Sequence, residues 1–452
     1  MQESEYKGQW WLPDRPRRKA VGTLRLSGHG SAVLDLVGSF TGNTSFSEPP
    51  ERDIILGSCG GKAITLHRCI LTKARETIGA VQSQPVYQFF ATEAYIGVQF
   101  RSGADIKFGS VSVVYSNIDE WLNLHVFDIQ HEQDRTIITY EEPRPIEIDV
   151  TDVGKVSIIS GRVGPTMSYV QTEATIKQKT FVKVEPAKEI PYEDYVPTMY
   201  HIRNLLSLGV GQPVHPTEIM GTTKKTKQLI RDKPYYPSVQ IISTRWSMGE
   251  VPESLFPYRM RFTFSDVSDR MQLFLNTWFK KAELLDPVYD LYFGILYNQH
   301  MFLEQRFLSL IQAIESYHRR FMKNCELSEE EHKTRVAEIL GAVAEKHREW
   351  LEKDILPYSN EPSLRRRLKD VLAKCSAIVS LNKGDQRNFV NRVVTTRNYL
   401  THYDASLRAG AARGVDLLQL TQRLKVLVET CLLLELGFEA SEVDKLFARG
   451  AR

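Results

Sequence analysis

The sequence lacks the features of several large classes of protein. Its five cysteines form no C-x-x-C pair and show no zinc-ligand spacing with histidines. The most apolar helical stretch, residues 424–438, is interrupted by Lys425, Glu429 and Glu435, so no segment is apolar for long enough to cross a bilayer. The N-terminus is polar and acidic, unlike a signal peptide. We therefore expect a protein of a reducing, cytoplasmic compartment with no membrane span and no metal site.

A strong charge of one sign is also missing. Lys and Arg number 58 against 55 Asp and Glu, which gives a net charge of +3. Any surface that binds a polyanion would therefore have to be a local patch. No internal repeat or low-complexity tract is visible, and 452 residues exceed the usual size of one domain. The composition is that of a globular protein of two or three domains.

The first part of the chain, to about residue 185, has the pattern of β-structure. Short runs rich in Val, Ile, Thr and Tyr are separated by glycine and polar turns, and many alternate as in Leu34-Asp35-Leu36. No helical segment of crossover length lies between them, which argues against a parallel sheet. The predicted strands are Val21–Leu26, Ala32–Val37, Ile54–Leu56, Ala63–Leu66, Val86–Phe90, Val111–Tyr115, Thr136–Tyr140, Val156–Ile159 and Phe181–Val184. We predict a mainly antiparallel domain, sandwich or barrel-like.

The segment Gly57-Ser58-Cys59-Gly60-Gly61-Lys62-Ala63 has the appearance of a phosphate-binding loop. Leu56 stands where that motif needs its first glycine, and Ala63 stands where it needs Ser or Thr. The segment therefore predicts a glycine-rich β-turn.

Further elements complete this domain before the pattern becomes helical. We predict a helix over Tyr192–Leu208 and closing strands at Val239–Ser243 and Tyr258–Phe264. After Asp266 the apolar residues recur at helical spacing. The predicted helices cover about 268–283, the residues after 287, 301–322, 328–350, 363–381, a segment capped by Asp385, and 417–434. The fold class is α+β, with a β domain over 1–265 and an all-α bundle over 266–452.

The most informative motif is Arg397-Asn398-Tyr399-Leu400-Thr401-His402. It follows an apolar helical stripe of Phe389, Val390, Val393 and Val394, and Arg397 lies within about 20° of the direction of Val390. An arginine cannot lose its proton, so its place on a packing face is costly unless an anion or a partner group meets it. This placement indicates a functional arginine.

The histidine of the motif requires a particular local structure. On a continuous helix Arg397 and His402 would diverge by about 140°. We therefore expect the helix to loosen or end near Leu400, with Arg397 reaching round to the histidine. Asn398 lies four residues before His402 and shares its flank, so its amide is predicted to orient the imidazole.

These two side chains suit the cleavage of RNA by its own 2′-hydroxyl. The reaction needs a base, an acid for the leaving oxygen, and positive charge for the crowded phosphorane. Histidine can serve as acid or base near neutral pH, and arginine donates to phosphate oxygens. No cofactor or metal is needed. One motif supplies one histidine, so acid and base together predict a symmetric homodimer.

Other charged residues have two interpretations each. Glu315 is predicted either to pair with Arg397 or to form a helical ion pair with Arg319. The basic runs are either solvated faces or contacts to RNA phosphates, the second with Tyr235 and Tyr236 beside it. Their members are Arg365, Arg366, Arg367 and Lys369 in the helical half, and Lys224, Lys225, Lys227, Arg231 and Lys233 in the β half.

The motif resembles the R-x4-6-H signature of the HEPN ribonucleases. The opening of the chain, with Trp10-Trp11-Leu12-Pro13, Gly22-Thr23-Leu24 and Leu34–Phe40, resembles the N-terminal domain of the ApeA family of bacterial anti-phage defence proteins. The two resemblances occur in the order found in that family and together span nearly the whole chain.

The resemblance implies an endoribonuclease of abortive infection, with transfer RNA among its substrate classes. It implies catalysis by Arg397 and His402 at a composite site shared by two subunits, and a β domain that responds to an unknown phage-derived trigger. Two alternatives remain open. The helical domain is a catalytically silent HEPN scaffold whose β domain binds a partner or ligand, or the β domain is a carbohydrate- or peptide-binding module on a helical dimerisation domain.

Overall fold

The computed structural model describes residues 3–27, 30–40, 48–75, 84–170, 172–246, 253–376 and 383–450. The chain divides into two compact units, Met1–Phe279 and Lys280–Arg452. The first unit is mainly an antiparallel β-structure and the second is helical, which confirms the predicted α+β class.

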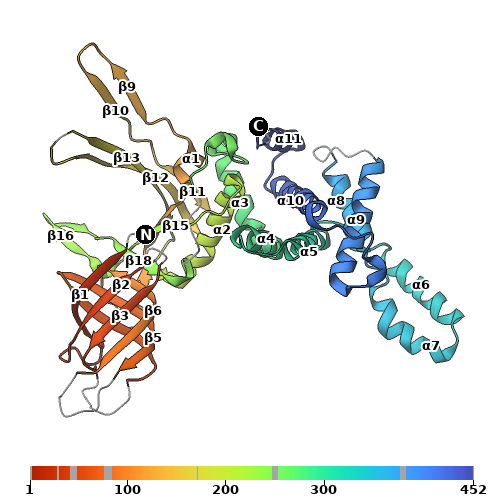
Figure 1. Ribbon diagram of the computed structural model, residues 1–452, viewed down its shortest axis with the longest axis horizontal. Helices are drawn as coiled ribbons and strands as arrows, with labels where there is room; N and C mark the ends of the chain where they lie inside the picture. The colour runs from red at the N-terminus through yellow and green to blue at the C-terminus, as the bar shows by residue number, and fades with distance from the viewer. Residues whose placement is uncertain are drawn as a thin grey trace. The chain divides into compact units, whose positions relative to one another are not determined.

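The first unit contains a closed six-stranded antiparallel barrel (Figure 1). Its strands pair in the order β1-β2-β3-β6-β5-β4, and β4 pairs with β1 to close the ring. They are β1 (Ser4–Trp11), β2 (Ala20–Leu26), β3 (Ala32–Val37), β4 (Glu51–Cys59), β5 (Lys62–Arg75) and β6 (Val86–Ile96). Of the two predicted arrangements, sandwich or barrel-like, these six strands form the barrel.

The barrel interior is filled by the alternate apolar residues that the sequence pattern predicts. Leu34 and Leu36 are fully buried, whereas Asp35 between them pairs with Arg25 at the surface. Trp10 is the largest of these side chains, and a Cβ at Gly57 would lie 2.3 Å from its ring. Glycine is therefore required at that position by the indole. The predicted glycine-rich turn is confirmed at Gly60 and Gly61, which join β4 to β5 with positive φ angles.

Strand β6 carries the sheet beyond the barrel. Its first residues pair with β3, and Glu93–Ile96 pair with β18. From β18 the sheet continues as β15-β8-β13-β12-β11. These strands are β8 (Ser110–Tyr115), β11 (Ile146–Val150), β12 (Gly154–Met167), β13 (Ala174–Glu185), β15 (Pro216–Thr222) and β18 (Val239–Ser243).

Short hairpins extend from this sheet in Figure 1. They are β9 (Phe127–His131) with β10 (Thr136–Tyr140), and β16 (Gln228–Ile230) with β17 (Lys233–Tyr235). The unit also contains the small pair β7 (Lys107–Phe108) with β14 (Ile190–Pro191), and helices α1 (Ile118–Leu122) and α2 (Tyr192–Val210).

One predicted strand is wrong. Residues 258–264 were expected to close the sheet, but the chain there forms the 3-10 turns Pro257–Arg259 and Phe264–Asp266. The apolar residues Met260 and Phe262 are fully buried without strand pairing. The alternating apolar residues of this segment are therefore explained by burial of their side chains, without a β-strand.

Helix α3 (Met271–Lys280) explains why the compact units divide later than the predicted boundary at 265/266. Asn276 donates to the backbone oxygen of Asp149, and the Trp278 indole donates to that of His201. Nearly all of α3 therefore belongs to the first unit by its contacts, although its sequence has the helical pattern of the second.

In the second unit, helix α5 contacts α4, α8, α9 and α10. Its fully buried residues include Phe307, Leu310, Ile311 and Ile314, which are the apolar stripe of the predicted helix 301–322. The helices are α4 (Ala282–Tyr297), α5 (Leu303–Phe321), α6 (Glu329–Ala342), α7 (Glu345–Trp350), α8 (Leu364–Lys374), α9 (Lys383–His402), α10 (Gly414–Glu435) and α11 (Ala440–Gly450).

The helix termini follow the sequence only in part. The capping box of Ser328 and Glu331 is confirmed at the start of α6. The single helix expected over 328–350 is instead two helices, because the chain at Val343 and Ala344 is extended. Helix α8 ends at Lys374, and residues 377–381 of the predicted 363–381 helix lie outside the described part of the chain.

Candidate functional site

The motif residues Arg397 and His402 occupy the last two turns of α9. The helix is anchored by Phe389, Val390 and Val393, which are all buried. It continues to His402, two residues beyond Leu400, near which it was expected to loosen or end. On an intact helix the two side chains leave in directions about 140° apart. The chain therefore does not unwind to bring Arg397 round to its own histidine.

The helix ends because the next residue leaves the helical conformation. Tyr403 has a φ of +52°, in the left-handed region, and its N–H donates to the Tyr399 carbonyl at 2.7 Å. The Thr401 hydroxyl donates to the Arg397 carbonyl at 2.8 Å in the same turn. His402 is thus presented at the exposed end of a rigid helix.

Arg397 is half-buried and has a local partner. One of its guanidinium nitrogens donates to the Asn398 side-chain oxygen at 3.2 Å. The amide that was predicted to orient the imidazole therefore contacts the guanidinium instead. Asn398 restricts the orientation of Arg397 while leaving most of its five N–H donors for other acceptors.

The segment after the motif returns against α9, and three side chains to which the sequence prediction gave no role lie together there. The Ala412 N–H donates to the buried Thr396 hydroxyl at 2.9 Å, which holds the segment on the helix. The Arg413 guanidinium lies 5.1 Å from the ring centre of Tyr399. The Tyr399 and Tyr403 rings are 5.7 Å apart and meet edge to face. The sequence places both tyrosines within or beside the motif, but only the tertiary structure brings Arg413 there.

A carboxylate lies near the histidine. Asp404 accepts from the backbone N–H and the hydroxyl of Ser406, at 2.9 and 2.8 Å. These hydrogen bonds lower the pKa of Asp404, and the positive form of His402 adds to the effect. The end of α9 therefore combines two aromatic rings, two arginines, one histidine and one ionised carboxylate.

Glu315 does not serve the motif as predicted. No hydrogen bond or ion pair joins it to Arg397 or to Arg319 in the described part of the chain, and Arg319 instead forms two contacts to Glu361, at 3.1 and 2.7 Å. The charge of Glu315 acts on Arg367. Burial lowers the pKa of Arg367 and Arg319 adds to this, whereas Glu361 and Glu315 oppose it.

The basic run on α8 divides into buried and exposed members. Arg367 is 3% exposed and donates to the Pro362 carbonyl, to His318 Nδ1 and to Glu361. The predicted RNA contact is corrected for this residue, because its donors are used inside the unit. The exposed members are Arg365, which donates to the Asn391 amide oxygen, Arg366, which pairs with Asp370, and Lys369.

In the first unit, Lys224 and Lys225 begin a 3-10 turn. The Lys225 ammonium pairs with Asp105 at 3.0 Å and lies 5.9 Å from the Phe100 ring centre. The Lys224 side chain is exposed, and its backbone N–H donates to Glu189. Tyr235 and Tyr236 are also exposed. Lys224 and these tyrosines therefore retain the exposed cation and aromatic rings that the sequence suggested for RNA binding. Lys225 instead interacts with Asp105 and Phe100.

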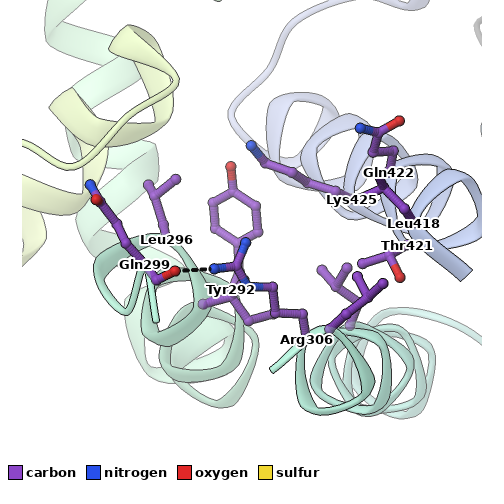
Figure 2. A pocket seen from close by; sticks show the side chains of 11 residues that line it. Tyr292, Leu296, Gln299, Arg306, Leu418, Thr421, Gln422 and Lys425 are labelled. Carbon is purple, nitrogen blue, oxygen red and sulfur yellow. Dashed lines mark hydrogen bonds between the residues drawn. The ribbon is translucent and has the colours of Figure 1, made fainter. Parts of the chain in front are cut away.

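A pocket of about 370 Å³ lies among α4, α5 and α10, away from the motif (Figure 2). Its walls include Leu296, Leu303 and Leu418, and neither Arg397 nor His402 lines it. Arg306 donates to the backbone oxygens of Met301 and Gln299, and Lys425 pairs with the buried Glu429 at 3.5 Å. Both of its cations therefore have partners within the unit.

Two general findings concern the described residues. Those residues contain no group of three or more His, Cys, Asp or Glu side chains placed to hold a metal ion. None of the helices in the described ranges combines the length and apolar character that a membrane crossing requires.

Comparison with known proteins gives two matches that do not overlap. The family model "ApeA N-terminal domain 1" matches residues 5–278, which is more than half of the chain. The family model "Apea-like HEPN" matches residues 308–442, which include the whole of α9. No curated protein and no solved structure matches the chain.

Proposed function

This chain belongs to the ApeA family, and from that premise we propose that it is an endoribonuclease of abortive infection whose active site uses Arg397 and His402 of two subunits. HEPN domains are typically ribonucleases, and the ApeA-like architecture suggests an RNase-type role in anti-phage defence. The observation that carries the proposal is the placement of both motif residues on the exposed end of α9, inside the HEPN match.

The proposed reaction is an attack of the RNA on its own backbone. One His402 takes the proton of the 2′-hydroxyl, and the 2′-oxygen forms a bond to the adjacent phosphorus. The bond from phosphorus to the 5′-oxygen breaks, and that oxygen receives a proton from an imidazolium. The products are a 2′,3′-cyclic phosphate and a 5′-hydroxyl. Arg397 binds the non-bridging oxygens, whose negative charge increases in the transition state.

A second subunit is part of the proposal. His402 is exposed at the end of its helix, and one imidazole cannot be base and acid at the same moment. A twofold axis beside the end of α9 supplies the second imidazole and a second Arg397. On this arrangement the 140° divergence within one helix is no obstacle, because each phosphate is held by groups from both subunits.

The substrate and the trigger are further parts of the proposal. The family suggests transfer RNA as a substrate class and a phage-derived trigger that acts through the β unit. Arg365, Arg366 and Lys369 are exposed on α8 and would contact RNA phosphates outside the reacting centre. The reaction itself assigns no role to a metal ion or an organic cofactor.

The test compares the full-length protein with His402→Ala on total bacterial RNA, with and without EDTA, followed by mapping of the ends. We expect cleavage by the wild type in EDTA, cyclic phosphate ends, and a loss of about 10²-fold or more in His402→Ala. A substrate with deoxyribose at the cut position should resist cleavage. Equal cleavage by His402→Ala would contradict the proposal and favour the scaffold alternative, as would cleavage of the deoxyribose substrate.

A further inference from the structure

Tyr403 is the most exposed aromatic ring beside the motif. It follows His402 directly and is 70% exposed. Its backbone has a φ of +52°, in the left-handed region that bulky residues rarely adopt. The hydrogen bond from its N–H to Tyr399 fixes this geometry. The chain thus holds an exposed ring beside the histidine at the end of α9.

A second ring supports the first. Tyr399 lies three residues before His402, on the neighbouring flank of the same helix. Its ring meets Tyr403 at 5.7 Å and an interplanar angle of 62°. An edge-to-face contact covers a face of only one of the two rings, so at least one face of the exposed Tyr403 ring is left for another planar group.

A cation completes the cluster. The Arg413 guanidinium is held 5.1 Å from the Tyr399 ring centre, at the residue that precedes α10. Guanidinium and tyrosine rings are the groups on which unpaired nucleobases stack, and arginine also donates to phosphate. The neighbouring anion is Asp404, whose carboxylate is occupied by Ser406.

We propose that Tyr403 is a nucleobase-binding residue of the ribonuclease site, which stacks on an unpaired base of a nucleotide beside the scissile linkage. Tyr399 holds the ring in position, and Arg413 steadies Tyr399 and faces the phosphate of the same nucleotide. This inference rests on the proposed function, because it places the base next to the phosphate that is attacked by the 2′-oxygen after His402 removes its proton. The ligand is any unpaired purine or pyrimidine, since stacking needs a π-face rather than a hydrogen-bond pattern.

The test uses a single-stranded RNA oligonucleotide that spans a mapped cut. We expect Tyr403→Ala to raise KM by about 5- to 100-fold while kcat changes little, because loss of one stacked base weakens binding. Tyr403→Phe and Tyr403→Trp should retain most of the affinity. Tyr358→Ala is the matched control, because Tyr358 is also exposed, at 71%, and lies in the same unit outside α9.

A second substrate separates stacking from a structural effect. When the nucleotide beside the cut is replaced by an abasic ribose, wild type and Tyr403→Ala should have the same KM. A difference that persists on every abasic position, or no difference on the intact RNA, overturns the inference.

Binding measurements in the His402→Ala variant separate the test of base stacking by Tyr403 from the test of the proposed cleavage chemistry. Binding of RNA with 2-aminopurine at the cut is measured in the His402→Ala background, where fluorescence quenching should disappear on Tyr403→Ala. Unchanged quenching rejects the role of Tyr403 even if cleavage by the wild type is confirmed. Cleavage that survives His402→Ala rejects the proposed chemistry instead, whatever Tyr403 does.

Discussion

The helical unit contains two arginine–histidine clusters with opposite surroundings. Arg367 and His318 lie in the interior between α5 and α8, at 3% and 0% exposure. Arg397 and His402 lie at the end of α9, half-buried and exposed. Arg367 comes from a predicted basic run, and Arg397 and His402 come from the predicted catalytic motif, whereas the sequence pattern did not single out His318.

The buried cluster is closed because its polar groups satisfy one another. Arg367 donates to His318 Nδ1 at 3.3 Å, so this nitrogen must accept, and His318 Nε2 then donates to Asp370 at 3.1 Å. The imidazole is therefore held in its neutral form, which has no free nitrogen for a substrate. At the end of α9 the imidazole has no hydrogen bond to any described residue. A phosphate bound at the surface could therefore accept hydrogen bonds from Arg397 and His402.

The largest expected effect is on catalysis at the exposed cluster. Arg397→Ala should reduce the rate of RNA cleavage by at least about a hundredfold, because the guanidinium stabilises charge that increases in the transition state. Its unfolding midpoint should stay close to that of the wild type, since the lost hydrogen bond to Asn398 is local. Single-turnover cleavage and thermal unfolding are measured together. A clearly lower unfolding midpoint in Arg397→Ala would indicate that Arg397 has a structural role and would contradict this prediction.

Arg367→Ala is the matched counterpart in the buried cluster. We expect a loss of about 3 kcal/mol of unfolding free energy, because the truncation leaves the Pro362 carbonyl and His318 Nδ1 without their donor in the interior. Denaturant unfolding measures this loss. The protein that remains folded should cleave RNA at the wild-type rate, and a large loss of kcat without a loss of stability would break the comparison.

A smaller effect is expected from pH. Burial lowers the pKa of His318 below its ordinary value near 6.5, although the hydrogen bond to Asp370 opposes the shift and the charges of Arg367 and Arg366 reinforce it. As the pH falls, His318 therefore takes up a proton in the unfolded chain at a higher pH than in the folded chain. Its contribution to the unfolding free energy is complete above about pH 6.5 and declines as the pH falls below that value. His318→Gln should flatten this part of the curve of unfolding free energy against pH. A wild-type curve that rises on acidification through this range would show that the sign is wrong.

The β unit was predictable where burial follows strand alternation. Leu34-Asp35-Leu36 places its apolar residues inside the barrel, and the turn at Gly60 and Gly61 follows from their conformational freedom. The closure of the barrel depends on β4 pairing with β1, which local pattern does not encode. The strand predicted at 258–264 failed because apolar side chains such as Phe262 reach the interior from irregular turns.

The amino-acid sequence alone determined that the chain has a β half and a helical half, and that Arg397 follows the apolar stripe of one helix. These properties depend on residue type and spacing, which are local. The tertiary structure decided that Arg367 is internal, that Asn398 serves the arginine, and that Arg413 is carried to Tyr399. Such outcomes depend on which surfaces other helices cover and which they leave in water, and that is settled only when distant segments of the chain come together.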